Sequence, residues 1–383
     1  MPLVSIIIPT HNRLPLLPQA IESVLAQDMR DLELIVVDDG STDGTGDVLA
    51  RYQEEARVRS VRQDNGGRSR ARNHGARLAT GEWLGFLDSD DRYLPKALSR
   101  HLAVIGQQPE TGLTLGGHTN CDAAGQTLGE RRPWEEGSLT LTHWLFNCLG
   151  MPGTLLVRRD WFEKLGGFDP ACEIAEDWDF FLRLARAGCP MQWVRQPVCV
   201  YRLHAGNSVA APAAHHRGSL HTLDKFFRAG ALPPELAALE PCARGWAHVV
   251  FAKRAWAGGD GEAARRSLDE ALRLDPTLGT ARRLEVLEAL LAPMNSQSAA
   301  APPAALLAAQ LPPALAAHPG ELRRAQARVE MAQFFRGLRG GSAGWTQAAA
   351  HLRAGLRHDP TWLFNRGVIA FGLRYGLRRI TRA

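Results

Sequence analysis

The run Leu3-Val4-Ser5-Ile6-Ile7-Ile8 is followed closely by the polar segment Thr10-His11-Asn12-Arg13, and this pairing recurs through the first hundred residues. This run is too short for the apolar region of a signal peptide, and we predict that it forms a buried strand. Further strands are expected at Leu32 to Val37, Val58 to Arg62 and Trp83 to Leu87. Helical patterns separate them, the first with Leu17, Ala20, Ile21, Val24 and Leu25 on one face. Alternation of this kind predicts βαβ units that build a mostly parallel sheet.

Polar segments follow the ends of the predicted strands. They are Thr10-His11-Asn12-Arg13, Asp38-Asp39-Gly40-Ser41, Asn65-Gly66-Gly67 and Asp88-Ser89-Asp90-Asp91. Ligands of open α/β sheets bind outside the carboxyl ends of the strands, so these loops are expected to converge on one crevice. The functional site is predicted there.

The rest of the chain divides by composition. From about residue 112 to 202 the pattern is mixed, with expected strands at 153–157 and 197–201 and a helix over 176–187. After Ser208 the composition shifts to Ala, Arg and Leu at helical spacing. We therefore predict an α/β domain over residues 1–212 and a smaller, all-α domain over 213–383, with an Ala/Pro-rich linker at about 299–313. Within the latter, residues 263–276 and 347–360 resemble each other and look like degenerate tetratricopeptide helices.

Charge and cysteine content limit the partners and the compartment. The formal net charge is +5 over 383 residues, and the charged residues of both signs alternate, which argues against nucleic acid as a partner. The six cysteines are scattered without metal-ligand spacing, and a cytoplasmic location fits them best. No apolar window is long enough to span a bilayer. The apolar and basic segment 362–379 could lie on the inner face of a membrane, or could form a last helix packed on the repeats.

Two acidic segments at strand ends are candidate binding residues. Asp38-Asp39 fits either an ordinary strand-to-helix turn or a carboxylate that accepts hydrogen bonds from a nucleotide base or ribose. The cluster Asp88-Ser89-Asp90-Asp91 crowds three carboxylates after an apolar strand, which is costly without a cation. Hard oxygen donors at this density suit Mg²⁺ or Mn²⁺, although a solvated turn is the alternative.

A third acidic segment, Glu176-Asp177-Trp178-Asp179, begins the helix predicted over 176–187. Acidic residues are common in a first turn because they complement the helix dipole. A general base that faces a metal-bound leaving group would use the same position.

Taken in order, these segments resemble the family 2 glycosyltransferases over about residues 1 to 210. The similarity rests on residues 5–13, 36–41, 71–75, 81–83, 88–90, 166–169 and 176–178. It implies a GT-A fold and an enzyme that moves a sugar, with inversion, from a nucleotide-diphosphate sugar to an acceptor hydroxyl. The acceptor would be a growing cell-surface glycan or a glycolipid.

The resemblance also implies roles for individual residues. Pro9, Thr10 and His11 would line the base pocket, and Asp39 would hydrogen-bond the base. Asp88 and Asp90 match the Asp-X-Asp motif, in which Asp90 would ligate Mn²⁺ or Mg²⁺. Asp177 matches the catalytic base.

Two further residues have open alternatives. Arg72, within the arginine-rich start of a helix, could bind phosphate or simply help solubility. His204 would lie near the diphosphate and the metal by resemblance, although a lone histidine is often structural.

Rival functions are a sugar nucleotidyltransferase, or a helical-repeat scaffold that carries a degenerate transferase domain. A nucleotidyltransferase would need a Gly-rich, Arg-containing loop after the first strand, and residues 9–13 form no such loop. The Gln-X-X-Arg-Trp motif of processive synthases is absent as well, so transfer of a single sugar per encounter is expected.

Overall fold

The computed structural model describes residues 3–204, 206–207, 211–292, 311–316, 318–339, 345–366 and 368. The chain divides into two compact units, residues 1–243 and 244–383. Most of the predicted linker at 299–313 lies outside the described residues. So does most of the segment 362–379, for which a membrane contact and a packed last helix were the two expectations.

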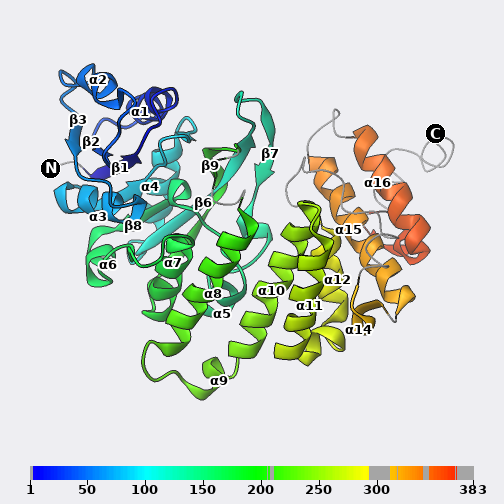
Figure 1. Ribbon diagram of the computed structural model, residues 1–383. Helices are drawn as coiled ribbons and strands as arrows, with labels where there is room; N and C mark the ends of the chain where they lie inside the picture. The colour runs from blue at the N-terminus through cyan, green and yellow to red at the C-terminus, as the bar shows by residue number, and fades with distance from the viewer. Residues whose placement is uncertain are drawn as a thin grey trace. The chain divides into compact units, whose positions relative to one another are not determined.

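The first unit is built on a mixed sheet of nine strands among the described residues, in the order β3-β2-β1-β4-β8-β6-β9-β5, with β7 beside β6 (Figure 1). Its first half is parallel and consists of β1 (Val4–Thr10), β2 (Leu32–Asp38), β3 (Val58–Arg62) and β4 (Trp83–Phe86). These are the four strands that the apolar runs predict. Because they run parallel, their polar loops emerge at one edge of the sheet.

The second half of the sheet mixes both directions. It contains β5 (Arg92–Tyr93), β6 (Leu113–Cys121), β7 (Thr127–Arg131), β8 (Leu155–Arg158) and β9 (Met191–Arg202). Strand β8 runs antiparallel to β4 and β6, β9 runs parallel to β6, and β5 runs antiparallel to β9. This curled sheet with helices on its faces is a GT-A fold, as predicted.

Strand β6 has no clear signal in the sequence because Gly116 and Gly117 interrupt its apolar pattern. A Cβ at Gly116 would lie 2.6 Å from Cγ2 of Val198, and one at Gly117 would lie 2.4 Å from the carbonyl oxygen of Arg131. The two glycines therefore let neighbouring strands approach closely at a point where the register with β9 shifts.

The alternating side chains of β1 explain how helices cover both faces of the parallel half. Ile6 and Ile8 join the core that contains the buried face of α1 (Leu17–Leu25). Ile7 points to the other face, toward α3 (Arg68–Leu78). A Cβ at Gly75 of α3 would lie only 2.4 Å from Cγ2 of Ile7. Glycine at this position thus lets α3 lie directly on the sheet.

The remaining described helices of the first unit follow the chain. They are α2 (Thr45–Ala50), α4 (Ala97–Gln107), η1 (Pro133–Glu135), α5 (Leu141–Phe146), η2 (Pro152–Thr154), α6 (Arg159–Lys164), α7 (Glu176–Arg186), α8 (Pro212–Arg228) and α9 (Pro234–Ala237).

Helix α8 packs on α7, although the sequence analysis places it in the second domain. Nζ of Lys225 in α8 lies 2.6 Å from Oδ2 of Asp169 and 2.7 Å from Oδ1 of Asp179 in α7. The first unit accordingly extends to residue 243. A functional boundary at residue 212 stays a prediction.

Helices make up the second unit where it is described. They are α10 (Glu240–Ala257), which begins before the boundary, and α11 (Gly261–Leu274), η4 (Pro276–Gly279), α12 (Arg283–Leu291), α14 (Pro313–Ala316), α15 (Pro319–Arg339), α16 (Trp345–His358) and η6 (Pro360–Phe364). No helix in the described part of the chain is long and apolar enough to cross a membrane.

The two similar segments of the second unit have the same local structure. After α11, Oδ1 of Asp275 accepts hydrogen bonds from N–H and Oγ1 of Thr277 at 3.0 and 2.6 Å. After α16, Asp359 accepts the same two bonds from Thr361 at the same distances. The sequence repeat is therefore also a repeat of structure, and its relation to tetratricopeptide units stays a prediction.

Candidate functional site

Asp39 organises the loops at the carboxyl ends of β2 and β3. Its Oδ1 accepts hydrogen bonds from Nε2 of Gln63 at 2.7 Å and from N–H of Gly66 at 2.9 Å, and its Oδ2 accepts one from N–H of Gly67 at 2.8 Å. The neighbouring Asp38 stabilises the turn, since its Oδ1 accepts from N–H of Ser41 at 2.8 Å. The hydrogen bond that a nucleotide base would donate to Asp39 stays a prediction, and Oδ2 has more acceptor capacity left for it than Oδ1.

The end of β1 lies beside this loop system. Pro9 and Thr10 are buried in register with β2, and N–H of Asp39 donates to the carbonyl oxygen of Thr10 at 2.8 Å. His11 is exposed, with Nδ1 2.9 Å from the carbonyl oxygen of Asp39 and with the Asn65 side chain 3.2 Å from its ring nitrogens. The three residues predicted to line a base pocket thus border the Asp39 loops.

The Asp88–Asp91 cluster follows β4 at the same edge and is held in place by Arg202 of β9. N–H of Arg202 donates to Oδ1 of Asp91 at 2.9 Å, and its Nε donates to the carbonyl oxygen of Asp90 at 3.2 Å. Burial and the adjacent carboxylates of Asp90 and Asp88 raise the pKa of Asp91 well above its ordinary value. Asp91 is therefore an internal support of the loop, while Asp88 and Asp90 are more exposed.

Asp90 and His204, the two predicted metal ligands, lie together although they are far apart in the sequence. Nε2 of His204 is 2.9 Å from Oδ2 of Asp90, and Nε of Arg13 is 3.6 Å from the same oxygen. A carboxylate and an imidazole are both suitable for Mn²⁺. Among the residues that the structure describes, no group of three His, Cys, Asp or Glu side chains could hold a metal. Mg²⁺ in proteins is usually bound by one or two carboxylates, with substrate phosphates as further ligands.

Arg72 connects this cluster to the start of α7. Its Nη2 lies 2.5 Å from Oδ1 of Asp88, and its Nη1 lies 2.7 Å from Oε1 of Glu176. The side chain is only 1% exposed. Burial raises the pKa of Asp88, but the Arg72 guanidinium outweighs it, so the net pKa of this carboxyl lies below its ordinary value. The predicted contact of Arg72 with phosphate stays a prediction, and both terminal nitrogens of the side chain are occupied by carboxylates.

Asp177, the predicted base, follows Glu176 in the first turn of α7. Burial, and next the negative charge of Glu176, raise the pKa of Asp177 to about 7, although Arg72 and Arg68 lower it. Its Oδ1 accepts a hydrogen bond from N–H of Trp178 at 2.8 Å. A partly exposed carboxyl with a pKa near neutrality is suited to take a proton from a hydroxyl.

Three residues hold predicted site residues in place and were not predicted to do so: Gln63, Arg202 and Glu176. Gln63 and Arg202 follow or end ordinary strands, and no local pattern marks them. The pairing of Glu176 with Arg72 joins residues that are 104 positions apart, which local spacing cannot reveal.

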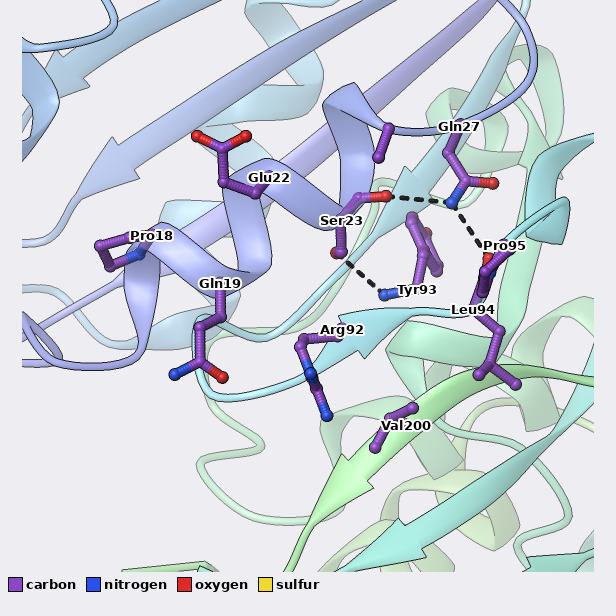
Figure 2. Close-up of a pocket in the computed structure, with 11 residues that line it drawn as sticks. Pro18, Gln19, Glu22, Ser23, Gln27, Arg92, Tyr93, Leu94, Pro95 and Val200 are labelled. Carbon is purple, nitrogen blue, oxygen red and sulfur yellow. Dashed lines mark hydrogen bonds between the residues drawn. The ribbon is translucent and has the colours of Figure 1, made fainter. Parts of the chain in front are cut away.

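A groove of about 590 Å³ lies elsewhere, between α1 and β5 (Figure 2). Its lining includes Gln19, Ser23, Gln27 and Arg92, and none of the predicted site residues borders it. Figure 2 shows the hydrogen bonds from Nε2 of Gln27 to the carbonyl oxygens of Ser23 and Leu94, which connect the helix to the segment after β5.

Comparison with known proteins gives consistent similarities. Residues 5–166 match the family described as Glycosyl transferase family 2. An uncharacterized glycosyltransferase of Nostoc sp. is 32% identical over 220 residues, which are 55% of this chain and 68% of that protein.

Solved structures are similar at the level of the fold. A mannosyltransferase from Pyrobaculum calidifontis in complex with GDP-Man and Mn²⁺ has a TM-score of 0.52 at 22% identity, covering 73% of this chain and 76% of the other. S. aureus TarS 1-349 in complex with UDP-GlcNAc has a TM-score of 0.53 at 18% identity, covering 86% and 88%.

Proposed function

Because this chain belongs to the family 2 glycosyltransferases, we propose that it transfers one sugar from a nucleotide-diphosphate sugar to an acceptor hydroxyl, with inversion and with a divalent cation. The observation that carries the proposal is the Arg72 bridge, which joins Asp88 to Glu176 and so brings the Asp-X-Asp segment and the candidate base to one site.

The donor site is proposed at the edge where β1, β2, β3 and β4 end. Pro9, Thr10, His11 and Asp39 would bind the nucleoside, and Asp88 would lie toward the sugar or the diphosphate. The P. calidifontis structure contains GDP-Man and the TarS structure contains UDP-GlcNAc, which supports a nucleotide-sugar donor without fixing its base.

Asp90 and His204 would hold Mn²⁺ or Mg²⁺. The Mn²⁺ in the P. calidifontis structure supports a metal of this kind. When bound, such a cation neutralises negative charge on the departing nucleoside diphosphate.

Asp177 would act as the general base. Its carboxylate takes the proton of the acceptor hydroxyl while that oxygen forms a bond to the anomeric carbon. The bond from the anomeric carbon to the diphosphate oxygen breaks on the opposite face, and the nucleoside diphosphate leaves. Attack from the opposite face inverts the configuration.

The acceptor is proposed to be a cell-surface glycan or a glycolipid. A glycolipid acceptor would suit an enzyme that works on the inner face of a membrane. The basic, apolar segment at 362–379 could provide a peripheral contact there.

Nucleoside diphosphate affinity tests the proposal. Binding of UDP and GDP is measured by calorimetry with Mn²⁺ and with a chelator, in wild type and in Asp90→Ala. We expect strong, metal-dependent binding of one nucleotide that Asp90→Ala weakens to the level seen with the chelator. Asp64→Ala is the matched control, because Asp64 is an exposed aspartate near the same strand edge and has no hydrogen bond or ion pair within the described part of the chain. Equal affinity with and without metal would contradict the metal assignment.

A further inference from the structure

The Arg72 side chain donates hydrogen bonds to two carboxylates that lie far apart in the sequence. It donates from Nη2 to Asp88, at the end of β4, and from Nη1 to Glu176, in the first turn of α7. Glu176 is itself only 5% exposed, so this half of the bridge is shielded from water. A planar guanidinium can serve two carboxylates in fixed directions, which a lysine ammonium cannot reproduce.

The surroundings of Arg72 fix its orientation. The guanidinium carbon lies 5.3 Å from the ring centroid of Phe168, and Gly75 keeps the helix that carries Arg72 directly on β1. Nε of Arg72 is buried and has no hydrogen-bond partner among the described residues. The two carboxylates therefore provide the polar partners of this buried cation.

The first turn of α7 is the segment that Arg72 joins to α3 and to the Asp88 loop. Ala175, which precedes it, has φ of 69°, a left-handed conformation that is unfavourable for alanine, and it provides no side-chain cap. Glu176, Asp177 and Asp179 follow, so three carboxylates crowd one turn. Asp179 pairs with Arg183 and Lys225, and Arg72 is the cation that pairs with Glu176.

We propose that Arg72 and Glu176 are positioning residues for sugar transfer: Arg72 fixes the first turn of α7 to the Asp88 loop, and Glu176 places a negative charge beside Asp177. This inference rests on the proposed role of Asp177 as base. It gives Arg72 an indirect role in place of direct phosphate binding.

The charged and titratable groups around Asp177 come from several elements. Arg68 and Arg72 of α3 lower its pKa, and Glu176 of α7 raises it. Cys148, after α5, and Tyr201 of β9 also interact electrostatically with Asp177 and have raised pKa values, so both are neutral at working pH. Burial and, next, the neighbouring anion Glu176 thus raise the pKa of Asp177 to nearly neutral pH.

Two variants separate the effect of the Arg72 bridge on the position of α7 from the effect of the Glu176 charge on Asp177. Glu176→Gln keeps an oxygen that can accept from Arg72 but removes the charge. We expect the acidic limb of its pH–rate profile to move down by on the order of one pH unit, while the rate at high pH falls by less than about fivefold. Arg72→Lys keeps the charge but cannot span both carboxylates, and we expect the limb to stay in place while kcat falls at least about tenfold.

Arg183→Lys is the matched control. Arg183 also pairs with a carboxylate of the first turn of α7, with Nη2 2.7 Å from Oδ2 of Asp179, but it is not among the groups that shift Asp177. We expect this variant to lower the melting temperature without moving the pH–rate profile. Affinity for the nucleoside diphosphate that binds the wild type is measured in parallel for all three variants.

The following outcomes would contradict the positioning roles of Arg72 and Glu176. An unmoved acidic limb in Glu176→Gln, or full kcat in Arg72→Lys, would overturn the inference. A loss of nucleotide affinity in Arg72→Lys that accounts for the whole loss of rate would also overturn it, in favour of direct phosphate binding. Carbon-13 titration of the Asp177 carboxyl, assigned with Asp177→Asn, follows the same shift without any turnover. It separates this inference from the proposed function, because the carboxyl titration in Glu176→Gln tests the effect of Glu176 even if Asp177 is not the base.

Discussion

The rate of sugar transfer is predicted to rise with pH from about 6 to 8, because Asp177 must lose its proton before it can accept one from the acceptor. Burial and Glu176 raise the pKa of this carboxyl to about 7. At such a pKa, roughly one-tenth of the enzyme is ionised at pH 6 and roughly nine-tenths at pH 8, so kcat/KM should increase about tenfold over this range. An ordinary aspartate, with a pKa of 3.8, would give a flat profile there.

The same pKa predicts an effect on stability with a definite sign. The folded chain holds the Asp177 proton to about pH 7, whereas the unfolded chain releases it near 3.8. The contribution of this group to stability is therefore fully present below about pH 4 and is lost as pH rises through about 7. Asp177→Asn, which cannot ionise, should melt at a higher temperature than wild type at pH 8 and at nearly the same temperature at pH 4.

The assay is release of nucleoside diphosphate from the preferred nucleotide sugar at saturating Mn²⁺, between pH 5.5 and 8.5, with melting curves on the same samples. A rate that does not change between pH 6 and 8 would contradict the role of Asp177 as the base. An acidic limb that persists in Asp177→Asn would assign the ionisation to another group.

Three further predictions concern the donor site and the helical unit. His204→Ala should weaken nucleoside diphosphate binding in Mn²⁺ but leave the weak binding in chelator unchanged, which calorimetry measures. Asp39→Ala leaves the N–H groups of Gly66 and Gly67 without their acceptor, so it should cost about 1–3 kcal/mol of stability in chemical denaturation, and it should also weaken nucleotide binding. A chain truncated after residue 230 should bind nucleotide like the full chain; one truncated after residue 212 lacks Lys225 and should melt at a lower temperature while keeping all donor-site residues. Loss of binding in a folded 1–230 fragment would show that residues after 230 contribute to the site.

The parallel half of the sheet was predictable from the sequence because β1, β2 and β4 are short apolar runs that polar segments follow. Ile6, Ile7 and Ile8 need to be buried on both faces, and only a strand covered by helices on both sides achieves that. The mixed half was harder to predict. Gly116 and Gly117 lie in the middle of β6, where close approach of neighbouring strands matters more than strand propensity.

The candidate site was predictable as a set of strand-end residues, and the structure places Asp39, Asp88 and Asp90 at one edge. The contact between His204 and Asp90 agrees with their pairing as candidate metal ligands, and their binding of a metal stays a prediction. The partner of Arg72 could not be predicted from the sequence. A guanidinium near a helix start suggests an anion, but only the fold determines that this anion is Glu176 on another helix.

If Asp177 removes the acceptor proton during sugar transfer, Asp177→Asn should change one of two measured quantities and not the other. The first is the initial rate of transfer from the nucleotide sugar that stabilises the wild type most in a thermal-shift panel of uridine and guanosine diphosphate sugars. The second is affinity for the corresponding nucleoside diphosphate with Mn²⁺. We predict that the rate falls by at least ~10²-fold, as for loss of a general base, while the affinity changes little. A nearly normal rate would contradict this role of Asp177, because asparagine can replace an aspartate that only stabilises a helix start.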